Sequence, residues 1–226
     1  MCGRFALTLP HQSVADIFNV APDETILGRG PRYNICPTTQ IEAVFLDGGA
    51  RRIGRMRWGF IPHWYKAMNG GPLLINARSE TIANKPAFAK AARERRCLIP
   101  ASGFYEWRKV DEKTRQPYWV SAASGANLPL VAFAGVWREW AGQEGPVASC
   151  AIVTTDASVA LKHIHHRAPL AIGSADWGLW LGEEGKGAAR LMTPPAEDFW
   201  DFHEVDPKVG SNKADGPDLM APLAKG

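Results

Sequence analysis

Cys2 is the residue of this chain whose position offers the most distinctive chemistry. If the initiator Met1 is removed, the free α-amine and the thiol of Cys2 lie on adjacent carbon atoms, as a 1,2-aminothiol. Such a group condenses with an aldehyde to an imine, and the thiol can then close a five-membered thiazolidine ring. An N-terminal nucleophile also serves for amide hydrolysis. The alternative is that Cys2 is a small residue that follows the start codon by chance.

Glu106 is a second candidate, because it interrupts a run of aromatic residues in the sequence Gly-Phe-Tyr-Glu-Trp at 103–107. Strand alternation predicts that Glu106 and Phe104 share one face of a strand and that Tyr105 and Trp107 share the other. A carboxyl group among aromatic rings is a candidate general acid or base. The alternative is a surface carboxylate on an edge strand.

Histidines gather in one place, since three of the six fall at positions 163, 165 and 166. No carboxylate or cysteine follows them at ligand spacing, so we expect no metal site and no cofactor. A single catalytic histidine just before a strand is the favoured interpretation.

Arginines and tryptophans around 51–60 suggest a second kind of chemistry. Arg55 and Arg57 share a face of the predicted strand, about 6.6–7 Å apart, which resembles the spacing of successive phosphates. Trp58 and Trp64 could stack on unpaired bases. The alternatives are a solvated sheet face for the arginines and ordinary core packing for the tryptophans.

The charge of the chain is small in sum but uneven along its length. Formal net charge is +3, whereas residues 1–120 carry 18 Lys and Arg against 10 Asp and Glu, a balance of +8. Residues 121–226 carry 8 against 13, a balance of −5. This asymmetry predicts one basic surface and is compatible with a polyanionic partner.

The four cysteines, at 2, 36, 97 and 150, form no Cys-x-x-Cys pair, so a zinc ribbon or a redox motif is not expected. No run of 18 apolar residues predicts a membrane-spanning helix, and the N-terminus lacks a signal pattern. We therefore expect a cytoplasmic protein with free thiols.

Short apolar segments separated by Gly- and Pro-rich turns predict a sheet-rich fold. We expect strands at 3–8, 41–46, 51–60, 73–77, 97–107, 118–122, 130–137, 148–155 and 199–205, and helices at 10–19, 86–96, from 174, and at 188–192. These elements predict a single α+β domain over 1–226, with a mostly antiparallel or mixed sheet that curls into a barrel-like core and a few peripheral helices. Residues 213–226 are expected to form a surface tail with loose last residues.

Several short motifs occur in one order along nearly the whole chain, from residue 2 to about 212. They are Cys-Gly-Arg-Phe at 2–5, Pro-Arg-Tyr-Asn-Ile at 31–35, Arg-Trp-Gly-Phe-Ile-Pro at 57–62, Asn-Ala-Arg-Ser-Glu-Thr at 76–81, Cys-Leu-Ile-Pro at 97–100, Gly-Phe-Tyr-Glu-Trp at 103–107 and Ile-His-His-Arg-Ala-Pro at 164–169. In this order the set closely resembles the SOS-response-associated peptidase family, the proteins that shield abasic sites. Ala168 departs from the family pattern, in which Met usually precedes the proline.

The resemblance implies a reaction. Family members bind single-stranded DNA and trap the ring-opened aldehyde of an abasic site in a thiazolidine with the N-terminal cysteine. They are also credited with removing their own initiator methionine and with slow release of the crosslink. On this basis we expect a DNA repair enzyme that acts as a monomer on single-stranded DNA containing abasic sites, in the cytoplasm and at the nucleoid when bound to DNA.

The resemblance also implies roles for particular residues. The catalytic set matches Cys2, Asn76, Glu106 and His165, where His165 is chosen because the family histidine stands two residues before an arginine. The DNA-binding set matches Arg4, Asn34, Trp58, Arg78, Trp107 and Arg167. Two other functions stay open, namely a cysteine-type peptidase with Cys2 as nucleophile and a non-covalent single-strand binding module.

Overall fold

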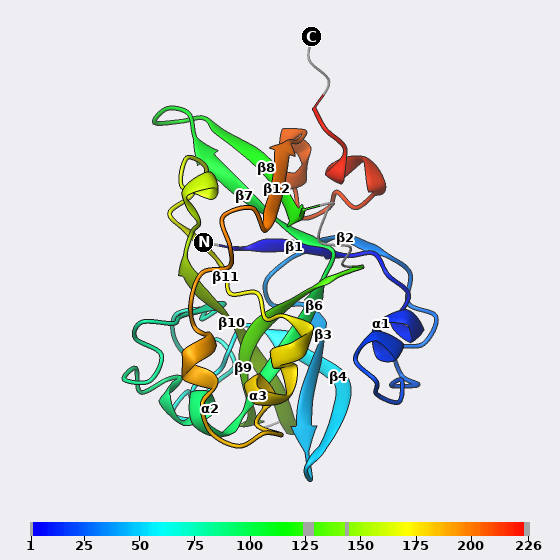
Figure 1. The fold of residues 1–226 in the computed structure, drawn as a ribbon, viewed down its shortest axis with the longest axis vertical. Helices are drawn as coiled ribbons and strands as arrows, with labels where there is room; N and C mark the ends of the chain where they lie inside the picture. Colours follow the sequence, from blue (N-terminus) through cyan, green and yellow to red (C-terminus); the bar gives the residue numbers. More distant parts are fainter. Residues whose placement is uncertain (1, 124–128, 143–144, 224–226) are drawn as a thin grey trace.

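The fold consists of two β-sheets stacked one above the other, with short helices at their edges, as the computed structural model shows (Figure 1). The structure describes residues 2–123, 129–142 and 145–223. No helix among them is long and apolar enough to cross a membrane.

The lower sheet closes on itself into a five-stranded barrel, which confirms the barrel-like core expected from the sequence. Around the barrel run β10, β4, β3, β6 and β9, and the pairing of β9 with β10 closes the circle. Two short strands add to β10 outside this circle. The strands are β3 (Gln40–Asp47), β4 (Ala50–Trp58), β5 (Asn76–Arg78), β6 (Arg96–Ala101), β9 (Val131–Gly142), β10 (Gly145–Asp156) and β11 (Arg167–Pro169).

The upper sheet is antiparallel and carries the N-terminal strand in its interior. Its order is β12 (Trp200–Glu204), β8 (Arg115–Ala122), β7 (Gly103–Lys109), β1 (Arg4–Leu7) and β2 (Arg32–Ile35). β1 therefore lies between β2 and β7, and the register places Arg4 opposite Tyr105. This pairing holds the start of the chain beside the strand that carries Glu106.

The predicted single strand over 97–107 is wrong, because β6 and β7 belong to different sheets. The chain leaves the barrel at Ser102, whose amide bonds the carbonyl of Ala6 at 2.7 Å. Gly103 then approaches β8 so closely that a Cβ would lie 2.4 Å from the Val120 carbonyl oxygen. Glycine is thus required where the chain passes from one sheet to the other.

The aromatic core fills the space between the two sheets. The ring of Phe5 packs edge-on against Trp58 and Phe133, and Phe104 packs against Phe133 as well. Alternation along β1 and β7 of the upper sheet sends Phe5 and Phe104 inward. Of the two interpretations left open for Glu106, the buried one agrees with the structure and the surface carboxylate does not, since Glu106 is 5% exposed.

The helices are short and lie at the periphery of the sheets (Figure 1). They are α1 (His11–Ile17), α2 (Ala89–Glu94), α3 (Trp177–Leu181) and the 3-10 turns η2 (Val159–Leu161), η3 (Ser174–Asp176), η4 (Ala188–Leu191), η5 (Pro207–Gly210) and η6 (Pro217–Met220). The helix expected over 86–96 is limited to α2, because the chain enters β6 at Arg96.

The C-terminal segment packs against the outer face of the upper sheet. Leu219 is 1% exposed and lies in a cluster with Ala6, Tyr105, Trp119 and Val209. The amide of Leu223 also bonds the carbonyl of Glu204 at 2.8 Å. The described part of the predicted surface tail is therefore anchored by a buried side chain, whereas its last three residues lie outside the described range.

Candidate active site

Cys2 lies where three segments that are distant in sequence meet. It precedes β1 and is fully buried. The Nδ2 group of Asn76, the first residue of β5, donates a hydrogen bond of 2.9 Å to the Cys2 carbonyl oxygen. Glu106 of β7 contributes its charge to the surroundings of the Cys2 thiol. Three of the four residues of the predicted catalytic set thus meet at the start of the chain.

Asn76 is held by the sheet and presents an acceptor beside the N-terminal segment. β5 runs parallel to β10, with Asn76 opposite Ile152. Its Oδ1 atom is buried and accepts no hydrogen bond from the described residues. A buried acceptor without a donor is costly in a folded protein, so this atom is suited to a group that carries N–H or O–H. An amine or a carbinolamine hydroxyl would satisfy it.

The thiol of Cys2 is surrounded by a poorly hydrated and negatively charged environment. Burial, and after it the charge of Glu106, raise the pKa of the Cys2 thiol well above its ordinary value. The Sγ–H group donates to the Arg4 carbonyl oxygen at 3.8 Å. The thiol is therefore protonated at neutral pH and is a weak nucleophile in this state.

His165 completes the catalytic set beside Glu106. Its Nδ1 atom lies 4.0 Å from Oε2 of Glu106 and accepts a hydrogen bond of 3.0 Å from the Arg167 backbone N–H. Burial lowers the pKa of His165, although the charge of Glu106 acts in the other direction. The ring is therefore neutral near pH 7, and the bond from Arg167 leaves the proton on Nε2.

Arg167, which the sequence placed in the DNA-binding set, is directed into the protein. It is 6% exposed and donates to both oxygens of Glu80, at 2.7 and 3.0 Å, to Asp156 at 2.7 Å and to the Thr154 carbonyl at 2.6 Å. Because its backbone N–H also bonds His165, this network fixes the orientation of the histidine. Sequence reasoning missed Glu80 and Asp156, although Glu80 is part of the 76–81 motif.

Arg4 and Asn34 form hydrogen bonds with the C-terminal segment. The Nη atoms of Arg4 donate to the carbonyl oxygens of Val209 at 2.7 Å and Gly210 at 3.0 Å, and to Oδ1 of Asn34 at 2.9 Å. Nδ2 of Asn34 has three carbonyl acceptors in the same segment, which are those of Val209, Ser211 and Ala214. No sequence pattern indicates this arrangement, because 205 residues separate Arg4 from Val209.

The remaining members of the predicted DNA-binding set differ in accessibility. Arg78 ends β5 and is exposed. Trp107 is half-buried and packs on the cluster that contains Leu219. Trp58, which the resemblance placed in the DNA-binding set, is 0% exposed: its ring belongs to the core and its Nε1 donates to the Ile75 carbonyl at 3.0 Å. Through that bond Trp58 supports the start of β5.

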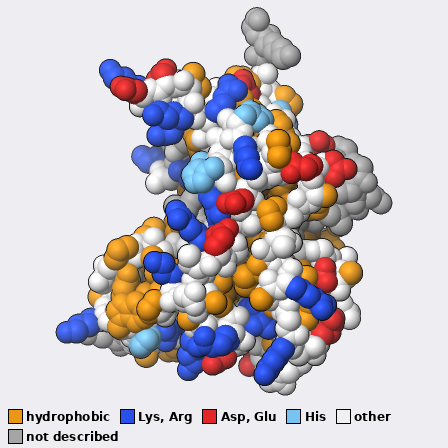
Figure 2. Space-filling view, turned by 60° about the vertical axis from the view of Figure 1, so that its left-hand side comes forward, with side chains coloured by type: hydrophobic (Ala, Val, Ile, Leu, Met, Phe, Trp, Pro, Cys, Tyr) orange, Lys and Arg blue, Asp and Glu red, His pale blue; other side chains and the backbone are white. Residues whose placement is uncertain are grey.

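The surface beside the N-terminus carries charges of both signs. The N-terminus lies on the left of Figure 1, and Figure 2 brings this side forward. Lys and Arg side chains are distributed over this face, with histidine and acidic side chains among them where the outline narrows between its upper and lower parts. The basic surface expected from the charge asymmetry is thus a mixed one on this face. Within the described residues, no group of three or more His, Cys, Asp or Glu could hold a metal ion.

Comparison with known proteins gives one consistent result. Residues 1–212 match the family model described as SOS response associated peptidase (SRAP). The chain is 35% identical over 227 residues to abasic site processing protein YoaM of Bacillus subtilis, covering 97% of both chains. It is 30% identical to abasic site processing protein YedK of Escherichia coli, covering 99% of this chain and all of that protein, and 31% identical to HMCES of Pongo abelii, covering 85% and 65%.

Solved structures agree on the fold. A protein from Bacteroides thetaiotaomicron superimposes with a TM-score of 0.88 at 20% identity over 99% of this chain and 100% of that chain. A phage-related protein from Bordetella bronchiseptica gives a TM-score of 0.71 at 28% identity over 90% and 94%. The two-sheet architecture is therefore shared with these proteins.

Proposed function

The chain belongs to the SOS response associated peptidase family, and we propose that it processes abasic sites in DNA by a covalent reaction of Cys2. The observation that carries the proposal is the convergence of Asn76, Glu106 and His165 on the start of the chain. These groups lie near a thiol that is buried and protonated, which is compatible with a reaction in which the amine of Cys2 attacks before the thiol does.

The first step requires that Met1 be removed, because only then does Cys2 carry an α-amine. Neutral amine attacks the aldehyde carbon of the ring-opened sugar, and a carbinolamine forms. Loss of the hydroxyl as water gives the imine. The buried Oδ1 atom of Asn76 is available to accept a hydrogen bond from the attacking amine or from the carbinolamine hydroxyl.

The second step uses the thiol. Sulfur adds to the imine carbon, the S–H proton passes to nitrogen, and a five-membered thiazolidine results. Since burial and Glu106 hold the thiol in its protonated form, the proton that nitrogen requires is already present on sulfur. Addition of a thiol to an imine changes no oxidation state, so the step requires no external oxidant.

Glu106 and His165 are the groups that can move protons during ring opening and loss of water. Glu106 is 5% exposed and its Oε2 lies 4.0 Å from the imidazole. Neutral His165 with its proton on Nε2 can donate that proton to a departing hydroxyl and recover it later. The same two groups would protonate the thiazolidine nitrogen when the crosslink is released. We propose this slow release as the lyase activity of the protein.

The DNA substrate is proposed to be single-stranded. An abasic sugar must reach a buried cysteine, and an unpaired strand can turn a nucleotide outward at low cost. Exposed Arg78, two residues from Asn76 on β5, is placed to hold a flanking phosphate. We further propose that the protein acts as a cytoplasmic monomer that joins the nucleoid only while bound to DNA.

A denaturing gel of protein mixed with abasic single-stranded DNA tests the covalent step. Wild type should give a shifted band that resists denaturation, and Cys2→Ala should give none. Cys2→Ser keeps the amine but has no thiol, so it should give an imine that reduction traps and that otherwise dissociates. A band of equal amount and lifetime with Cys2→Ala would overturn the proposal.

Peptidase activity is proposed only for the removal of Met1. Cys2 is 0% exposed, so an unrelated peptide has no direct access to its thiol, whereas Met1 is its neighbour in the chain. Intact mass of the purified chain should show loss of one methionine in wild type and its retention when Glu106 is replaced by Gln. Hydrolysis of an unrelated peptide by the mature protein would support the broader peptidase reading instead.

A further inference from the structure

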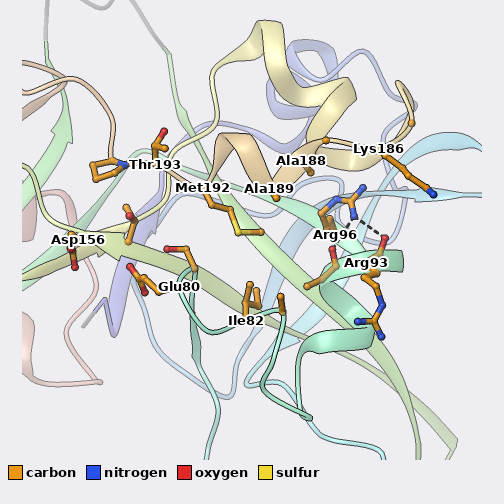
Figure 3. A pocket seen from close by; sticks show the side chains of 17 residues that line it. Glu80, Ile82, Arg93, Arg96, Asp156, Lys186, Ala188, Ala189, Met192 and Thr193 are labelled. Carbon is orange, nitrogen blue, oxygen red and sulfur yellow. Dashed lines mark hydrogen bonds between the residues drawn. The ribbon is translucent and has the colours of Figure 1, made fainter.

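A cavity of about 850 Å³ lies beyond the end of β5, on the side away from Asn76 (Figure 3). It is formed by the turn after β5, the end of β10, α2 with the start of β6, and the segment around η4. This volume is within the range of small-molecule sites. No step of the proposed reaction at Cys2 uses it.

The two ends of the cavity differ in chemistry. Figure 3 shows Glu80 and Asp156 at one end, Arg96 and Lys186 at the other, and Ile82 and Met192 between them. The cavity is therefore acceptor-rich at one end, apolar in the middle and cationic at the far end. Its other lining groups include the hydroxyl-bearing residues Ser79, Thr155 and Thr193 at the acceptor-rich end and Arg93 at the cationic end.

The cationic end holds charge that the protein does not neutralise. Nε and Nη1 of Arg96 donate to the carbonyl oxygens of Trp180, Ala92 and Arg93, and these neutral acceptors leave the charge of the guanidinium in place. Burial lowers the pKa of this guanidinium, and no carboxylate among the described residues forms an ion pair with it. Arg93 and Lys186 likewise have no ion pair within the described residues. This end is thus suited to an anion.

The acceptor-rich end is suited to a polar but not to an anionic group. Arg167 neutralises part of the charge of Glu80 and Asp156, which remain 48% and 70% exposed and keep acceptor capacity. Carboxylate oxygens and hydroxyls together accept from and donate to the edge of a nucleobase. A phosphate would be repelled here and would be directed to the opposite end.

We infer that this cavity binds a nucleotide. The polar edge of the base points toward Glu80 and Thr155, the ring of the base and the sugar lie over Ile82 and Met192, and the phosphate points toward Arg96. The nucleotide could be free in solution or part of the DNA strand. The second case rests on the proposed function, because it requires that DNA be bound at Cys2. Glu80 is four residues beyond Asn76, hence at most about 14 Å away along the chain. A strand attached at Cys2 could place a nearby nucleotide in the cavity.

Binding of 5′-dAMP, deoxyadenosine and inorganic phosphate to the mature protein, followed by NMR or calorimetry, tests the site. The nucleotide should bind at least about tenfold more tightly than either part, because only it occupies both ends. Ala189→Trp, at an exposed position of the lining, should fill the cavity and abolish this binding. Lys186→Ala should weaken it about two- to fivefold, as loss of one exposed cation does.

Lys90→Ala provides the matched control, because it removes an exposed cation of α2 that does not line this cavity. It should change neither nucleotide binding nor crosslinking. The strand-borne source is tested with 2-aminopurine placed at each position beside an abasic site. If the crosslinked strand fills the cavity, one position should change in fluorescence, that change should vanish with Ala189→Trp, and free 5′-dAMP should no longer bind.

The inference is overturned if neither free 5′-dAMP nor any flanking 2-aminopurine responds to Ala189→Trp. It is also overturned if inorganic phosphate binds as tightly as the nucleotide. Wild-type crosslinking to abasic DNA is measured alongside. A normal crosslink together with either of these results removes the nucleotide site and leaves the proposed reaction of Cys2 intact, whereas loss of the crosslink itself refutes the proposed function.

Discussion

Arg4 and Arg78 share one role in the resemblance but lie in opposite surroundings in the folded chain. Arg4 lies two residues from Cys2 and donates to carbonyl oxygens of Val209 and Gly210 and to Asn34. Arg78 ends β5 with an exposed guanidinium that makes no ion pair within the described residues. The first is engaged by the protein itself, and the second is available to a ligand.

The difference shows that a cation near a reactive centre can hold a segment of the protein in position instead of binding a ligand. By holding the segment 209–214 against β1 and β2, Arg4 and Asn34 tie the start of the chain to its C-terminal part. Since Cys2 lies two residues before the start of β1, we expect this tie to determine where the nucleophile lies. Arg78, by contrast, should affect only how DNA is held.

Loss of the Leu219 side chain should have the largest effect on this tie. Leu219 is 1% exposed in the cluster with Ala6 and Tyr105, so Leu219→Ala should lower the free energy of unfolding by about 2–5 kcal/mol. Urea denaturation measures the loss, and Met220→Ala, which truncates a half-buried neighbour, is the control. A change as small as that of the control would show that the C-terminal segment does not stabilise the sheet.

Arg4→Ala should follow, with a loss of about 1–3 kcal/mol, because it leaves the Gly210 carbonyl oxygen and Oδ1 of Asn34 without this donor and leaves the Val209 carbonyl with only the 3.3 Å bond from Asn34. The crosslinking rate should fall, whereas the salt dependence of DNA binding should stay as in wild type. Arg4→Lys keeps the charge but not the planar fork. Recovery of full stability and rate by Arg4→Lys would mean that charge alone matters, and the positioning role would be refuted.

The sequence contained more of the site chemistry than of the contacts that position it. Cys2, Asn76, Glu106 and His165 stand in short local motifs, and their side-chain types already indicate amine, acceptor and proton-transfer chemistry. The barrel also followed from strand alternation and turn residues. The tie between Arg4 and Val209 did not, because carbonyl acceptors belong to every residue and leave no pattern in the side chains.

The burial of the two predicted DNA-binding tryptophans was equally hidden from the sequence. Trp58 and Trp107 have the same residue type and the same resemblance, yet one is fully buried and the other half-buried. Whether an aromatic ring faces the core depends on which sheet covers it. The separation of β6 from β7 at Ser102, which the continuous apolar run concealed, decides this for residues 103–107.

Arg78→Ala should give a smaller effect that is confined to DNA binding. Removal of one phosphate contact on a single strand should reduce the slope of log K against log salt by about 0.7. The free energy of unfolding should change by less than about 0.5 kcal/mol, because the side chain is exposed. An unchanged salt slope would place Arg78 outside the DNA path and remove the contrast with Arg4.

The smallest effect concerns pH and isolates His165, because an arginine side chain does not lose its proton in proteins. Burial lowers the pKa of His165, so below about pH 6.5 the unfolded chain takes up a proton that the folded chain still excludes. Stability from this group is therefore complete above that pH and is lost as pH falls through the lowered folded pKa. His165→Gln should reduce the slope of unfolding free energy against pH by at most about 1.4 kcal/mol per unit, with no change in the slope for Arg78→Ala. An identical slope in wild type and His165→Gln would show that the imidazole is protonated equally in both states and would remove the neutral histidine from the proposed proton transfers.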